Sequence, residues 1–176
     1  MPFRHQLFTF GAAALLALPA APAAARPASP EAEFLIAAHQ GNLAQMTAGR
    51  IAVRKSGNPV IRKLGKRFAA YHRKLDAQVK ATSETLAVRL PAEPNSEQQQ
   101  LAEQYRAASP AAFDTLFVTT QLANYERAAK LAGTALKIST DPAIRAIVTS
   151  AAPAIAANRA ALTAARDLLA SEQPRQ

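Results

Sequence analysis

Few side chains in this sequence have the chemistry to act inside a helical protein. Four polar residues each lie near the middle of an otherwise apolar helical stripe: Gln45, His72, Asn124 and Asn158. Each lies roughly 20–24 Å from one end of its expected helix, so all four are expected at one level. A buried amide or imidazole is costly unless it is hydrogen-bonded. We therefore predict that these side chains form a mid-bundle polar layer, bonded to one another or to trapped water.

His72 is also a candidate metal ligand. Di-iron bundles use inward glutamates and a Glu-x-x-His pair on each of two helices, and no Glu-x-x-His occurs in this sequence. Amides are weak ligands for the metals that imidazole suits. The layer is therefore predicted to be structural, with no metal and no cofactor, and metal binding at His72 is the alternative. His39 lies far from the apolar stripe of its helix and is predicted to be a surface histidine.

No motif in the sequence predicts catalysis. We find no nucleophile elbow, Gly-rich phosphate loop or paired-carboxylate signature. Cysteine is absent, which excludes disulfides and cysteine metal sites. The sequence therefore predicts a protein that is not an enzyme.

Positive charge is concentrated in one region. The chain has 21 Lys and Arg against 12 Asp and Glu. Seven basic residues lie on the side of one expected helix opposite its apolar stripe: Arg62, Lys63, Lys66, Arg67, Arg73, Lys74 and Lys80. Such a face attracts anionic polymers or lipid head-groups, but it lacks the aromatic side chains of a single-strand nucleic-acid groove. A plain solvated face is the ordinary interpretation of such a helix, and these residues are also a candidate anion-binding face with no nucleic-acid partner expected.

The helices that position these residues are marked by four pairs of a capping residue and a proline. A Ser, Asn or Asp side chain caps the first turn, and proline suits the first helical position because its φ is preset and its missing N–H is not needed. The pairs are Ser29-Pro30, Asn58-Pro59, Ser109-Pro110 and Asp141-Pro142. With the apolar periodicity they predict long helices over 30–56, 59–89, 110–138 and 142–171, and a short helix over 96–107.

The connections predict how these helices are arranged. Short links at Gly57 and at 139–141 make antiparallel hairpins of the first two and the last two long helices. The connection over 90–109 is long enough to cross the length of the bundle. The predicted fold is all-α: a ferritin-like four-helix bundle of two hairpins joined by a long crossover. Four glycines inside helices are expected to mark close helix approach: Gly41, Gly49, Gly65 and Gly133.

The first 25 residues resemble a cleavable signal peptide. Arg4 begins a basic region, an apolar run follows over 7–18, and Ala23-Ala24-Ala25 forms a cleavage site. The mature chain is thus expected to begin at Arg26 and to form one domain over 26–176. Without a cysteine for lipid attachment, we expect a periplasmic protein with no membrane-spanning segment.

Several short motifs, in this order and spacing, resemble a known family. The chain is similar to the exported bacterial proteins catalogued as domain of unknown function 4142, often labelled outer-membrane or periplasmic proteins with a ferritin-like bundle. The similarity covers residues 31–169 and rests on Glu33-Phe34-Leu35, Asn58-Pro59-Val60, His72, Phe113-Asp114, Phe117-Val118, Gln121 and Pro153. The family typically has Glu at position 45, Asp at position 71, and His at positions 124 and 158. This chain keeps only the ionisable residue at position 72.

Three kinds of function agree with these observations. The first is an envelope or stress-associated protein that binds through its basic helix face. The second is a ferritin-like metal or redox protein with a degenerate mid-bundle site. The third is a carrier of a small ligand in a mid-bundle cavity left by Gly and Ala residues. The sequence does not determine the partner, the ligand or the oligomeric state.

Overall fold

The computed structural model describes residues 29–172, which form five α-helices. The predicted signal peptide over 1–25 and its cleavage site lie outside the described residues. The helices are α1 (Pro30–Lys55), α2 (Pro59–Thr85), α3 (Ser96–Ala107), α4 (Pro110–Ile138) and α5 (Pro142–Glu172). Among them, none is both long enough and apolar enough to cross a membrane.

Each long helix begins at the proline of a cap–proline pair. The Asn58 side chain accepts a hydrogen bond from the Val60 N–H at 2.9 Å, and the Asp141 side chain accepts from the Ala143 N–H at 2.8 Å. The Ser29 and Ser109 side chains likewise accept hydrogen bonds, from the N–H groups of Ala32 and Ala112, three residues further along the chain. Local chemistry therefore sets the four starts.

Helix α2 ends at Thr85, four residues before the predicted end at 89. Ala87 adopts a left-handed conformation with φ of 52°. The Val88 N–H then bonds to the Ser83 carbonyl at 2.8 Å, and the Ala87 N–H bonds to the Glu84 carbonyl at 3.2 Å. This is a Schellman motif, with alanine at the position where glycine is usual. It directs the chain away from α2 and into the crossover.

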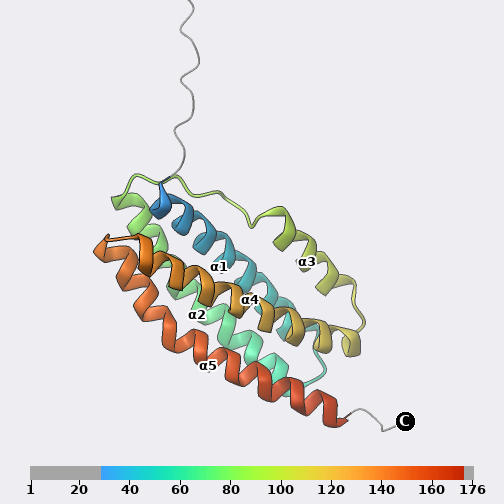
Figure 1. The fold of residues 1–176 in the computed structure, drawn as a ribbon. Helices are drawn as coiled ribbons and strands as arrows, with labels where there is room; N and C mark the ends of the chain where they lie inside the picture. The colour runs from blue at the N-terminus through green and yellow to red at the C-terminus, as the bar shows by residue number, and fades with distance from the viewer. Residues whose placement is uncertain (1–28, 173–176) are drawn as a thin grey trace, which may run out of the picture.

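The four long helices form a bundle of two antiparallel hairpins, and α3 lies along its outside (Figure 1). Helices α1 and α2 make one hairpin, and α4 and α5 make the other. The segment after α2 passes back over the bundle end, and α3 runs along the outside toward the start of α4 (Figure 1). Between the hairpins, α1 contacts α4 and α2 contacts α5.

Two of the four interior glycines allow close helix packing. A Cβ added at Gly49 would lie 2.5 Å from the Gly65 carbonyl oxygen, and one added at Gly65 would lie 2.7 Å from the Gly49 carbonyl oxygen. The α1–α2 hairpin is therefore tight at this point. The prediction is wrong for Gly41 and Gly133, because a Cβ there would meet nothing within 4 Å. These two glycines border open space instead.

The core has two apolar clusters. The larger is rich in aromatic side chains, including Phe68, Phe117 and Tyr105, and lies toward the start of α4. The smaller is mainly aliphatic and includes Leu35, Val79 and others near the opposite end. The polar side chains of the candidate site lie between these clusters along α1, α2, α4 and α5.

Candidate functional site

A chain of hydrogen bonds joins one side chain from each of the four long helices. The His72 Nδ1–H donates to the Asn42 Oδ1 at 2.8 Å, because an amide oxygen only accepts. Nε2 of the same ring is therefore an acceptor, and the Tyr125 hydroxyl donates to it at 3.0 Å. Asn158 Nδ2 in turn donates to the Tyr125 oxygen at 2.8 Å. We call these four residues the polar chain.

The polar chain is electrically neutral. Burial lowers the pKa of His72 from 6.5 to about 4, and the charge of nearby Asp76 only partly opposes this effect. Burial also raises the pKa of Tyr125 well above its ordinary value. Both rings therefore stay uncharged near neutral pH, as the directions of the hydrogen bonds require.

The four residues of the predicted layer have different positions. His72 and Asn158 are both buried in the polar chain. Gln45 is buried, but its Oε1 has no hydrogen-bond partner. Asn124 is half-buried and accepts from Arg127 on its own helix. Neither Gln45 nor Asn124 bonds to His72.

The partners of His72 that the sequence analysis missed are Asn42 and Tyr125. Asn42 lies about one turn before Gln45 on α1, so both fall near the same side of the helix. Tyr125 ends a series of buried residues spaced four apart on α4: Phe113, Phe117, Gln121 and Tyr125. This series was the signal that could have found it, because residues at that spacing share one helix face.

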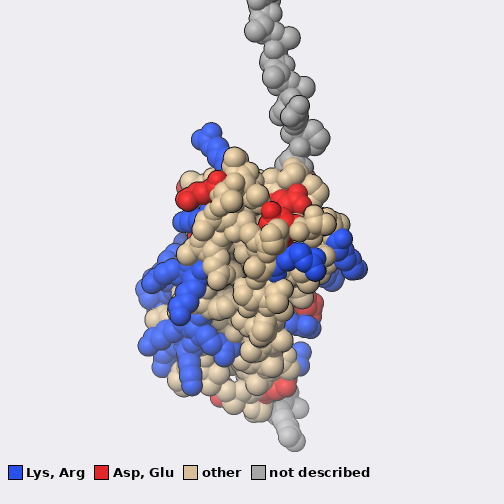
Figure 2. All heavy atoms as spheres, turned by 90° about the vertical axis from the view of Figure 1, so that its left-hand side faces the viewer, with Lys and Arg blue, Asp and Glu red and all other residues tan. Residues whose placement is uncertain are grey.

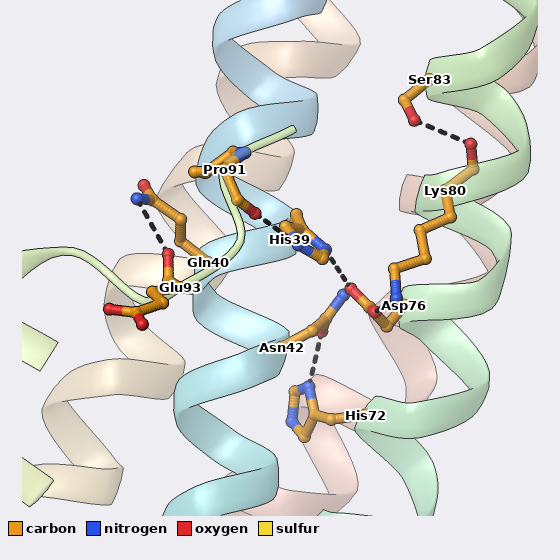
Figure 3. Close-up of polar contacts among 9 residues, drawn as sticks. All are labelled: His39, Gln40, Asn42, His72, Asp76, Lys80, Ser83, Pro91 and Glu93. Carbon is orange, nitrogen blue, oxygen red and sulfur yellow. Dashed lines mark hydrogen bonds and ion pairs between the residues drawn. The ribbon is translucent and has the colours of Figure 1, made fainter. Parts of the chain in front are cut away.

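A second buried polar cluster lies between α1 and α2 (Figure 3). His39 is only 3% exposed, so the prediction of a surface histidine is wrong. Its Nδ1 lies 2.6 Å from Asp76 Oδ1, and its Nε2 lies 3.0 Å from the Pro91 carbonyl oxygen. Lys80 Nζ contacts the other Asp76 oxygen at 3.3 Å. The crossover covers the side of α1 that helical periodicity assigns to solvent.

The His39 cluster ties three segments together. Both ring nitrogens face atoms that only accept hydrogen bonds, a carboxylate oxygen and a carbonyl oxygen. Each ring nitrogen lies within hydrogen-bond distance of one of these acceptors. His39 thereby links α1 to α2 through Asp76 and to the crossover through Pro91.

A cavity of about 350 Å³ lies beside the polar chain. Residues of all five helices line it, and α3 contributes to its outer side. Small side chains leave this space, including Ala44 and the open position at Gly41. Asn42, His72 and Tyr125 of the polar chain form part of the wall.

Four buried polar atoms of the residues around the cavity lack hydrogen-bond partners. They are Oε1 of Gln45, Oε1 of Gln121, Nδ2 of Asn42 and the Tyr71 hydroxyl. Gln45 is 8% exposed and Gln121 is 1% exposed. Each of these atoms has less than 1 Å² of solvent-accessible surface, so it lies against packed protein and not against the open space of the cavity.

Two of the seven basic residues of the predicted anion-binding face have structural contacts, and the other five are exposed. Arg62 is half-buried and donates to the Ser56 and Gly57 carbonyls at 3.0 and 2.7 Å, so it caps the end of α1. Lys80 pairs with Asp76. The other five are exposed and form no ion pair within residues 29–172: Lys63, Lys66, Arg67, Arg73 and Lys74. Figure 2 shows Lys and Arg side chains gathered along one side of the molecule.

A metal centre has little support among the described residues. Within 29–172 no group of three or more His, Asp or Glu side chains is placed to hold a metal ion. His72 has its two ring nitrogens engaged by Asn42 and Tyr125. The polar chain therefore uses the same atoms that a metal would need.

The comparisons with known proteins bear on these features. The family model described as "Domain of unknown function (DUF4142)" matches residues 16–165, and the polar chain and the cavity lie within that span. The chain belongs to this family. The description of DUF4142 states no function. No curated protein and no solved structure matches the chain.

Proposed function

We propose that this DUF4142 chain is an exported, non-catalytic binding protein whose mid-bundle cavity holds a small, mainly apolar molecule. The observation that carries the proposal is the 350 Å³ cavity, lined mostly by small and aliphatic side chains, with Asn42, His72 and Tyr125 of the polar chain in its wall. Ligand pockets are typically apolar clefts of this size with a few placed polar groups.

The state of His72 supports binding over catalysis. A general base needs a free lone pair near the reacting atom and a pKa near the working pH. Nε2 of His72 is occupied by the Tyr125 hydroxyl, and the pKa of the ring is about 4. The polar chain instead braces four helices around the cavity, which keeps the wall in place.

The same proposal includes the fold type and the compartment. Two antiparallel hairpins joined by a bundle-length crossover support a ferritin-like arrangement of the long helices. The basic and apolar regions before Ala25 support export to the periplasm. N-terminal sequencing of the purified periplasmic protein is expected to begin at Arg26, and an intact Met1 would contradict cleavage.

The experiment that tests the cavity compares two matched glycine variants. A cavity of about 150 Å³ binds benzene, so one of 350 Å³ has room for a larger aromatic molecule such as naphthalene. Gly41→Leu places a side chain in the cavity, and Gly133→Leu makes the same change at an open position that does not line it. Both glycines are helical, so both variants gain helix propensity.

Naphthalene binding is measured by calorimetry, and the thermal midpoint is followed with and without the probe. The proposal expects binding to the unmodified protein and to Gly133→Leu, and loss of binding in Gly41→Leu. Absence of binding to the unmodified protein, or equal binding by both variants, would contradict it.

A second candidate function rests on the basic face. Five exposed cations on α2 without ion-pair partners within the described residues favour contact with an anionic envelope polymer or lipid head-groups. Its test replaces Lys63, Lys66, Arg73 and Lys74 with Gln, sparing Arg62 and Lys80 because they have structural contacts. Co-sedimentation with anionic vesicles should decrease with salt and be lost in the variant. Equal sedimentation with neutral vesicles would exclude this function.

A further inference from the structure

We infer that α3 is a movable cover of the cavity, and that a ligand enters between α1 and α4 when the N-terminal half of α3 moves away from the bundle. This inference rests on the proposed binding function, since it describes how a molecule reaches the cavity. It depends on three features of α3: its place in the cavity wall, its few buried contacts, and a helix start that is bonded to itself.

Helix α3 forms the outer wall of the cavity. It lies outside the four long helices and contacts both α1 and α4 (Figure 1). Its residues that line the cavity are spread along its length, from Glu97 to Tyr105. Beneath it, α1 presents Gly41 and Ala44 and α4 presents Ala128 to the cavity. Because these small residues leave space between α1 and α4, moving α3 away would open the cavity to solvent at this place.

The cover is held by few buried contacts. Tyr105 is the one buried residue among the twelve of α3, whereas α1 and α2 bury nine residues each. Leu101 and Ala102 are half-buried and pack against the larger apolar cluster. Segments with few buried apolar contacts open locally while the rest of a fold stays intact. We therefore expect α3 to open more readily than the long helices.

The two ends of α3 are attached to the bundle differently. Near its C-terminus, the Tyr105 hydroxyl contacts Thr120 Oγ1 and accepts a hydrogen bond from Gln121 Nε2 at 3.2 Å. In its first turn, Glu97 lies 3.6 Å from Arg127 of α4, and both side chains are largely exposed. Exposed ion pairs contribute little to stability. The N-terminal half is therefore the part that moves, and Tyr105 is the pivot.

The start of α3 is bonded to itself. The Asn95 side chain accepts from the Gln98 N–H at 2.9 Å, and the Gln98 side chain accepts from the Asn95 N–H at 3.0 Å. This capping box satisfies the first turn without help from the bundle. Displacing the first turn from α1 and α4 therefore breaks neither of these hydrogen bonds.

The crossover before α3 provides the other fixed point. His39 Nε2 lies 3.0 Å from the Pro91 carbonyl oxygen, and this contact is part of the buried cluster on α1 and α2. The next contact along the chain is weaker, because Gln40 Nε2 donates to the Glu93 carbonyl at 3.4 Å in an exposed position. The moving segment thus lies between Pro91 and the pivot at Tyr105.

The test fastens the cover with a cleavable bridge. Glu97→Cys and Arg127→Cys, made together, place thiols at two exposed positions that line the cavity on α3 and α4. The chain has no cysteine of its own, so a bis-maleimide reagent with a central disulfide joins these two positions and a reductant cleaves the bridge. The matched control is Glu126→Cys with Arg159→Cys. It replaces an exposed pair 3.9 Å apart on α4 and α5, outside the cavity lining.

The binding kinetics of naphthalene are followed by stopped-flow fluorescence with the bridge closed and after its reduction. In the test pair, closing the bridge should lower the association and dissociation rate constants by at least about tenfold each and leave Kd unchanged, because exchange then lacks the opening step. The control pair should show the same rate constants in both states. Equal rate constants in both states of the test pair would overturn the inference.

Hydrogen exchange separates this inference from the function on which it rests. A helix of twelve residues is only marginally stable away from the bundle, so its amides exchange when the cover opens. Without ligand, α3 amides in the test pair should exchange at least about tenfold more slowly with the bridge closed than after reduction. If this holds and naphthalene does not bind, the cover is correct and the proposed function is wrong. If α3 amides exchange equally in both states, the cover is wrong even where naphthalene binds.

Discussion

The burial of His72 has a consequence for how stability depends on pH. The pKa of an imidazole is 6.5 in the unfolded chain and about 4 in the folded protein. Between these values the unfolded state binds a proton that the folded state does not. The free energy of unfolding must therefore fall as the pH is lowered from about 6.5 to about 4, and His72 contributes no further loss below that range.

The size of this loss follows from the two pKa values. At about 1.4 kcal/mol for each pKa unit, the change from 6.5 to about 4 corresponds to about 3 kcal/mol. This is a substantial part of the stability of an ordinary domain, which is roughly 5–15 kcal/mol. The physical source is the cost of placing a charge among Asn42, Tyr125 and the apolar clusters.

The assay is urea unfolding at closely spaced values from pH 7.5 to pH 4, for the unmodified protein and for His72→Gln. The glutamine does not titrate, so its variant loses stability only through the other groups, which both proteins share. The difference between the two unfolding free energies should shrink by about 3 kcal/mol across this range. Parallel pH curves for the two proteins would refute the reasoning.

Three further predictions concern packing and backbone geometry, and each is checked by chemical or thermal unfolding. Gly41→Ala should stabilise the protein by up to about 1 kcal/mol through helix propensity, whereas Gly49→Ala should destabilise it by about 1–3 kcal/mol because its Cβ meets backbone. Ala87→Gly should stabilise by about 1 kcal/mol, since φ of 52° strains alanine. Asp76→Ala should cost about 3 kcal/mol and increase proteolysis of the crossover, because it removes the buried partner of His39. No change in these three measurements would contradict the packing, the turn and the buried His39–Asp76 contact respectively.

Local signals in the sequence account for the helices themselves. A cap residue and the proline after it act within one turn, so Asn58 and Asp141 start their helices whatever the rest of the chain does. The apolar periodicity of α2 likewise places His72 on the buried side. The family was predicted from the order and spacing of short motifs, and the match over residues 16–165 confirms it.

Tertiary packing decided which polar atoms meet. The rotation of a helix about its axis depends on all its neighbours, and neighbouring residues are separated by about 100°. Tyr125 therefore bonds to His72 in place of Asn124, and Asn42 does so in place of Gln45. Periodicity within one helix cannot resolve these choices, because each involves the relative rotation of two helices.

The same reason applies to the buried His39 and to the cavity. His39 is covered by a segment that follows α2, more than 50 residues along the chain, and no pattern within α1 records that contact. The cavity exists because α1 presents Gly41 and small side chains where α3 and α4 do not come close enough to fill the space. A gap between helices depends on distances among all of them, and only the assembled bundle sets those distances.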